Sequence, residues 1–109
     1  CGDRRLMIEI RLVEHDGLIR SMHLHGHAEA GAYGEDLVCA GVSAIAIGLC
    51  NALDRMKGRA SICMKDNRID IRKIGEDRHT QDILQTAIVQ LQGMEERFPK
   101  NVTIKKTED

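Results

Sequence analysis

The chain has 109 residues, which suits one domain with a real core and is too short for two. Its 16 basic and 17 acidic side chains give a formal net charge of −1, without the basic excess of a phosphate-binding protein. We therefore expect a single domain over residues 1–109 and no direct nucleic-acid partner. With one Tyr, one Phe and no Trp, the core must be aliphatic.

Neither a membrane span nor a disulfide framework is predicted. The longest uncharged run, residues 37–53, is shorter than the roughly 20 apolar residues that a membrane helix needs, so it predicts a buried helix. The four cysteines contain no Cys-x-x-Cys pair, and no apolar signal segment follows Arg5. Free thiols in the cytoplasm are the expectation.

The first 25 residues predict a β-hairpin. Apolar residues alternate with polar ones over residues 6–13, the period of a half-buried strand. Asp16 and Gly17 form a typical hairpin turn, and a second strand follows from Leu18 until Gly26 ends it.

A loop and a helix come next. Residues 26–35 contain Gly26, Gly31 and Gly34 with one aromatic residue, Tyr33, which favours a mobile loop. Asp36 can cap a helix that is apolar almost all round and runs to about Met56.

The remaining elements complete the fold. Residues 60–65 and 68–74 flank an Asp-Asn turn and predict a second hairpin. Thr80 caps an amphipathic helix that Pro99 stops, and residues 102–104 form a last strand. The order β-β-α-β-β-α-β predicts an α+β two-layer sandwich, with two helices on one face of a mainly antiparallel sheet.

Cys39 is the strongest candidate for chemistry. With Asp36 as the cap, Cys39 is the third helical residue, where free amides and the helix dipole stabilise a thiolate. His27 lies on the preceding loop and can fold back as its general base, giving a dyad for acyl transfer. Asp36 lies three residues before Cys39 and Ser43 four residues after it, on the same stripe of the helix. Either they support the catalytic residues, or Asp36 only caps the helix and the Ser43 hydroxyl only bonds to a backbone carbonyl.

Two alternatives remain open from the residues alone. A free cysteine is most often a small buried hydrophobe, the role expected of Cys50 and Cys63. The alternating His23, His25 and His27 would share one strand face and could bind a metal ion, although no fourth ligand is obvious.

The sequence closely resembles the bacterial ribosomal-processing cysteine protease family known as Prp. The resemblance continues into the second helix and is carried above all by Gly26-His27-Ala28, Tyr33-Gly34, Asp36-Leu37-Val38-Cys39-Ala40-Gly41 and Ser43-Ala44. It implies a homodimeric cytoplasmic endopeptidase that removes the N-terminal extension of a large-subunit ribosomal protein, cutting after a phenylalanine.

In the family, the catalytic positions correspond to Cys39 and His27, and no metal or organic cofactor is used. Asp36 and Ser43 match the supporting positions, and residues 28–35 match a loop over the substrate. A non-enzymatic, ribosome-associated peptide-binding factor and a metal module of His23, His25 and His27 are the alternatives.

Overall fold

The described residues form two helices and five strands, which follow one another in the predicted order. The computed structural model describes residues 7–26, 33–65 and 68–109, with only the backbone for residues 33–36. The elements are β1 (Ile8–His15), β2 (Leu18–Gly26), α1 (Tyr33–Arg55), β3 (Ser61–Lys65), β4 (Arg68–Arg72), α2 (Arg78–Arg97) and β5 (Val102–Glu108).

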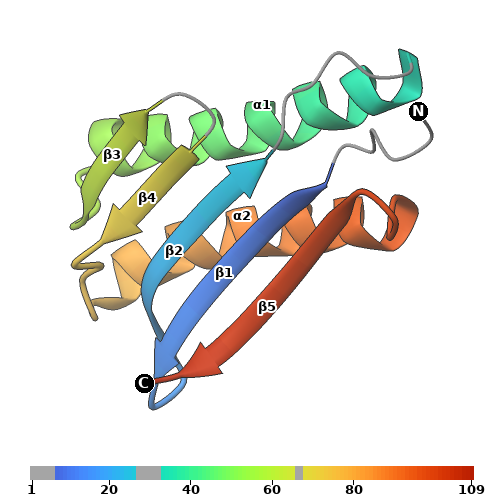
Figure 1. Ribbon diagram of the computed structural model, residues 1–109. Coiled ribbons are helices and arrows are strands. Elements are labelled where there is room, and N and C mark those ends of the chain that lie inside the picture. Colours follow the sequence, from blue (N-terminus) through green and yellow to red (C-terminus); the bar gives the residue numbers. More distant parts are fainter. Residues whose placement is uncertain (1–6, 27–32, 66–67) are drawn as a thin grey trace.

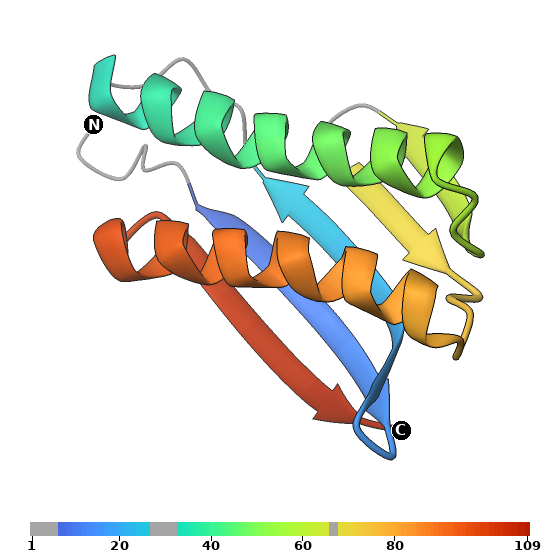
Figure 2. The same ribbon diagram turned by 180° about the vertical axis from the view of Figure 1, so that it is seen from behind.

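The strands form one mixed sheet in the order β3-β4-β2-β1-β5. Only the β1–β5 pair is parallel, and the other three pairs are antiparallel. Both helices cover the same face of this sheet (Figures 1 and 2), and no described element covers the other, which we call the open face. The predicted α+β sandwich is confirmed, with β5 extending well beyond the expected residues 102–104.

The first hairpin has the turn that its sequence predicts. Asp16 and Gly17 both have positive φ angles, 53° and 78°, as a two-residue hairpin turn requires. Along β1, Ile8, Ile10 and Leu12 are buried and alternate with more exposed residues. This alternation fixes which face of the sheet receives the helices.

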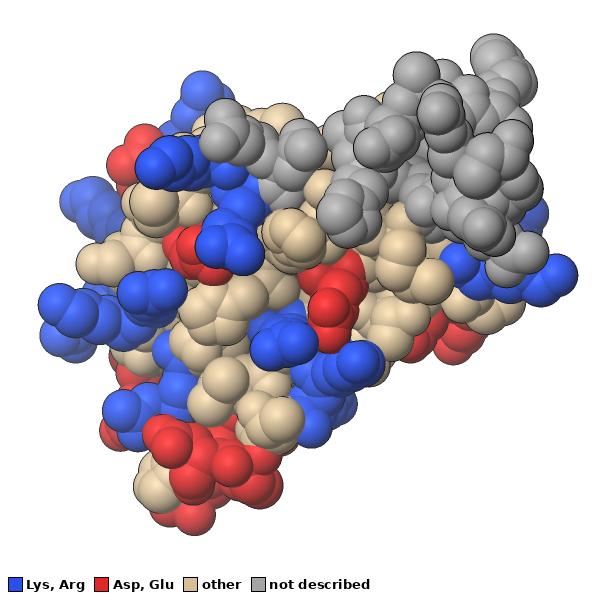
Figure 3. Space-filling view, viewed as in Figure 1, with Lys and Arg blue, Asp and Glu red and all other residues tan. Residues whose placement is uncertain are grey.

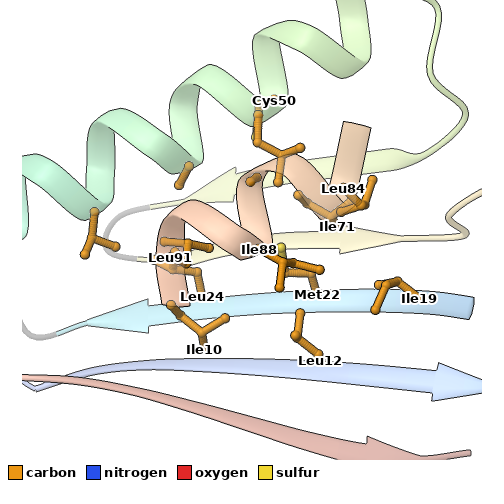
Figure 4. Packing of buried hydrophobic residues seen from close by; sticks show 14 of the residues in the cluster. Ile10, Leu12, Ile19, Met22, Leu24, Cys50, Ile71, Leu84, Ile88 and Leu91 are labelled. Carbon is orange, nitrogen blue, oxygen red and sulfur yellow. The ribbon is translucent and has the colours of Figure 1, made fainter. Parts of the chain in front are cut away.

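The core lies between the sheet and the helices and is aliphatic, as the composition predicts. Ile10 and Leu12 of β1 are fully buried, as are Leu84 and Leu91 of α2 (Figure 4). Burial of each such side chain contributes about 1.5–3 kcal/mol. The core therefore holds α2 firmly against β1 and β2.

Helix α1 is only half buried, contrary to the prediction. One stripe packs into the core, whereas Leu37 and Ile47 remain 62% and 47% exposed. The reason is that α1 lies in an outer layer of a two-layer fold, so one of its sides has no neighbour among residues 7–26, 33–65 and 68–109. Residues Leu37–Arg55 are long and apolar enough to cross a membrane by composition alone, a property that core helices share.

Helix α2 begins three residues earlier than predicted, and Thr80 is not its cap. The N-cap is Asp77, whose Oδ2 accepts hydrogen bonds from the Thr80 amide at 3.0 Å and the Thr80 hydroxyl at 2.8 Å. The Thr80 oxygen in turn accepts a bond from the Arg59 amide. Both residue types are favoured at helix starts, so their order in the chain does not reveal which one caps.

Candidate active site

Cys39 lies deeper in its helix than the sequence predicts. Helix α1 begins at Tyr33, which makes Asp36 its fourth residue and Cys39 its seventh. The N–H groups beyond the first turn are used within the helix, so the Cys39 amide is not free to stabilise a thiolate or an oxyanion. The prediction of Asp36 as the cap is wrong, because Asp is favoured both at the cap and within the first turn.

Cys39 opens onto a pocket of about 230 Å³ between α1 and the sheet. Cys39, Ser43 and Ile47 are four residues apart on α1 and therefore form one wall of it. We call this hollow the thiol pocket; its other lining residues include Ile8 of β1, Leu24 and Gly26 of β2, Met64 of β3, and Arg68 and Ile69 of β4.

The lining of the thiol pocket is mostly apolar. Leu24 and Ile8 are buried core residues, whereas Met64 is 55% exposed at the rim. Cys39 itself is partly buried and packs against the core cluster. The arrangement places a thiol beside space that suits a large apolar side chain.

The pocket brings together some of the predicted site residues. Ser43 lies beside Cys39, as the helix spacing predicts. Gly26 also lines the pocket, but it ends β2 and does not belong to a loop. Its position matters because the predicted base, His27, follows it directly in the chain.

Other predicted loop residues are placed differently. Tyr33 and Gly34 form the start of α1, so residues at both ends of the expected loop 26–35 belong to a strand or a helix instead. His27 and Gly31 lie outside the described residues, as does the side chain of Asp36. The structure therefore tests the position of Cys39 and leaves the roles of His27 and Asp36 as predictions.

Cys50 and Cys63, the two cysteines expected in the core, differ in burial. Cys50 is buried, as expected, and burial raises the pKa of its thiol. Cys63 is exposed, contrary to the prediction, because β3 is an edge strand with no buried side chain. Both thiols are free, as is that of Cys39.

Two of the three alternating histidines, His23 and His25, lie on the open side of the sheet. Because side chains alternate along β2, His23 and His25 project away from Leu24, which lines the thiol pocket. His23 Nδ1 lies 2.7 Å from Asp70 Oδ1 on β4, a carboxylate partner that the sequence did not indicate. Within residues 7–26, 33–65 and 68–109, no three His, Cys, Asp or Glu side chains come together as a metal site.

Comparisons with known proteins identify the family. Residues 7–103 match the family model of the cysteine protease Prp. The ribosomal processing cysteine protease Prp of Staphylococcus aureus (strain Mu50) is 36% identical over 96 residues, which cover 84% of this chain and 91% of that protein. Its Bacillus subtilis counterpart is 46% identical over 44 residues, about 40% of this chain and 39% of that protein.

Solved structures agree with this relationship. The S. aureus ribosomal processing protease Prp with a substrate peptide superposes with a TM-score of 0.85 at 33% identity, over 93% of this chain and 100% of that one. Its complex with a covalently linked product peptide gives 0.83 at 34% identity, with the same coverage. SMU.848 from Streptococcus mutans gives 0.87 at 28% identity over the full length of both chains. The chain belongs to the Prp family and is a cysteine protease.

Proposed function

We propose that this protease removes the N-terminal extension of a bacterial large-subunit ribosomal protein, cutting after phenylalanine, with Cys39 as nucleophile and His27 as general base. The ribosomal substrate is proposed because the relatives are named ribosomal processing proteases. The observation that carries the proposal is the position of Cys39 in the thiol pocket.

The thiol pocket supports both the nucleophile and the specificity. Of the three free thiols in the part of the chain that the structure describes, Cys50 is buried and Cys63 is on an edge strand, whereas Cys39 lines a pocket. The apolar walls suit the phenyl ring of the residue that precedes the scissile bond. Gly26 also lines this pocket, and His27 is the next residue in the chain.

The reaction then proceeds by acyl transfer. His27 takes the thiol proton, and the sulfur of Cys39 attacks the carbonyl carbon of the phenylalanine. The imidazolium returns the proton to the leaving amine as the C–N bond breaks, leaving a thioester. His27 then activates water, which hydrolyses the thioester and frees the thiol.

A synthetic peptide that spans the extension and the first mature residues tests this reaction. Cys39→Ala should abolish cleavage, a loss of about 10⁴-fold or more, and His27→Ala should lower kcat by about 10²–10⁴-fold. Cys63→Ala and His25→Ala are the matched controls and should cleave normally. Full activity of either Cys39→Ala or His27→Ala would refute the dyad.

We further propose that the protein is a homodimer whose contact includes the outer face of α1. Ala40, Ala44 and Gly48 are exposed at four-residue spacing there, next to Leu37 and Ile47. A helix face with small and apolar residues allows close packing against a second copy. A free nucleophilic thiol also needs a reducing compartment, which favours the cytoplasm.

Two measurements test these points. Ala44→Glu places a carboxylate on this helix face and should shift the mass in light scattering from dimer to monomer, whereas Gln85→Glu on the exposed side of α2 should not. A monomeric wild-type protein at micromolar concentration would contradict the dimer. Fractionation of the source cells should recover the protein with soluble cytoplasmic markers.

A further inference from the structure

The open face of the sheet is polar and carries most of its charge as cations. Strand pairing aligns two rows of side chains across all five strands on this face. The first row is Cys63, Asp70, His23, Arg11 and Lys105, and the second is Lys65, Arg68, His25, Glu9 and Thr103.

Arg72 extends this surface by one further row, on the same side of β4 as Asp70. We call the five cations the basic sheet face: Arg11, Lys65, Arg68, Arg72 and Lys105. Figure 3 shows their side of the molecule, with Lys and Arg atoms across much of its width and the largest acidic group at the lower end. A hollow of about 400 Å³ lies among the central side chains.

The two carboxylates that the described residues place on this face, Glu9 and Asp70, are already engaged. Glu9 Oε2 lies 3.1 Å from Arg11 Nε and 3.3 Å from Lys105 Nζ, and these contacts lower the pKa of Glu9. Asp70 binds His23. In the described residues, Lys65, Arg68 and Arg72 form no ion pair with a carboxylate, so their charge is available to a partner.

We propose that the basic sheet face binds the phosphate backbone of a structured RNA. Counted over the described residues, five cations against two engaged carboxylates make this face positive, although the whole chain has a net charge of −1. That overall balance is why composition predicted no nucleic-acid partner. The guanidinium group of an arginine can donate two parallel hydrogen bonds to two oxygens of one phosphate.

The side chains on the face favour RNA over a protein partner. The two rows contain no Phe, Tyr or Trp and no large aliphatic side chain, whereas the centre of a protein interface is enriched in such residues. Without Phe, Tyr or Trp, only the two histidines and the arginine planes are available to stack on a base. Contacts should therefore go to the backbone, with little dependence on RNA sequence.

Fluorescence anisotropy with a labelled RNA hairpin, measured at several salt concentrations, tests the proposal. Lys65, Arg68 and Arg72, with the one net positive charge of Arg11 and Lys105 beside Glu9, amount to about four phosphate contacts. They predict a slope of log K against log salt of roughly −3 to −4. The Lys65→Gln/Arg72→Gln variant should weaken binding about tenfold at low salt and reduce the slope by about 1.5. Arg78→Gln/Arg97→Gln removes two exposed arginines from α2, on the helix layer, and should bind like the wild type.

A gain of affinity provides a second test that misfolding cannot imitate. Glu9→Gln releases Arg11 and Lys105 from their shared carboxylate and should strengthen RNA binding, with the salt slope steeper by about one. Absence of RNA binding at low salt, equal weakening by the α2 variant, or equal competition by polyglutamate would overturn the proposal. RNA binding and peptide cleavage are measured separately, so failure of one does not imply failure of the other.

Discussion

Cys39 on α1 and Met64 on β3 line the same pocket, although a helix end and a turn separate them in the chain. Met64 is 55% exposed, and Ile47, on the same stripe of α1 as Cys39, is 47% exposed. The apolar rim of the thiol pocket is therefore built from two elements that meet only in the folded protein.

The rim of the thiol pocket should determine which substrate residue the protease accepts immediately before the scissile bond. Ile47→Trp places a larger side chain in the pocket wall and reduces the free volume of the pocket. It should lower kcat/KM for a phenylalanine peptide about 10–100-fold, because the phenyl ring of the substrate no longer fits. The same variant should cleave an otherwise identical alanine peptide at close to the wild-type rate.

Val89→Trp is the matched control for this change, since Val89 is exposed on α2 and does not line the thiol pocket. It should leave both peptides unaffected. Equal losses on the phenylalanine and alanine peptides with Ile47→Trp would show that the pocket does not read this residue.

The cysteines should differ in reactivity in the native protein. Cys50 is 4% exposed and burial raises its pKa, so it should resist iodoacetamide at pH 7.5 and react only after denaturation. Exposed Cys63 should be alkylated in the folded state. Peptide mass spectrometry over a time course measures both rates, and early labelling of Cys50 would contradict the packing of α1.

A buried glutamine should be important for stability. Gln81 of α2 is 6% exposed, accepts a bond from the Ile19 amide and donates to the carbonyls of Ile19 and Gly75, each at 2.9 Å. Gln81→Met keeps the volume but leaves buried backbone groups unpaired, which should cost about 2–4 kcal/mol in urea unfolding. Gln85→Met, at an exposed position of the same helix, should change stability by less than about 0.5 kcal/mol.

The helix cap should make stability sensitive to acid. The Thr80 hydrogen bonds hold the pKa of Asp77 below its ordinary value, so its contribution is present above about pH 4 and is lost as pH falls through the folded-state pKa. Asp77→Ala should therefore lower Tm by about 5 °C at pH 7 and by much less at pH 2.5.

Asp82→Ala removes an exposed carboxylate from the same helix and is the control for this pH dependence. Differential scanning fluorimetry from pH 2.5 to pH 7 follows all three proteins. A Tm deficit of Asp77→Ala that stays constant over this range would mean that the carboxylate charge is not involved.

The candidate site was predictable where its residues are local. Cys39 and Ser43 face the same pocket because four residues make about one helical turn. The boundaries were less predictable: α1 begins at Tyr33 and α2 is capped by Asp77, since several polar residues near a helix start are equally acceptable there. Cys63 was misplaced because nothing local marks β3 as an edge strand.

By itself, the sequence determined the alternation that makes the strands, the Asp16-Gly17 turn, the two helices and the Prp motif around Cys39. These depend on backbone periodicity and residue type, which act over a few neighbouring positions. Only the tertiary structure decided that Ile69 and Met64 line the same pocket as Cys39, that His23 meets Asp70, and that cations gather on one open sheet face. Strand order and register set these contacts, and both follow from packing between segments far apart in the chain.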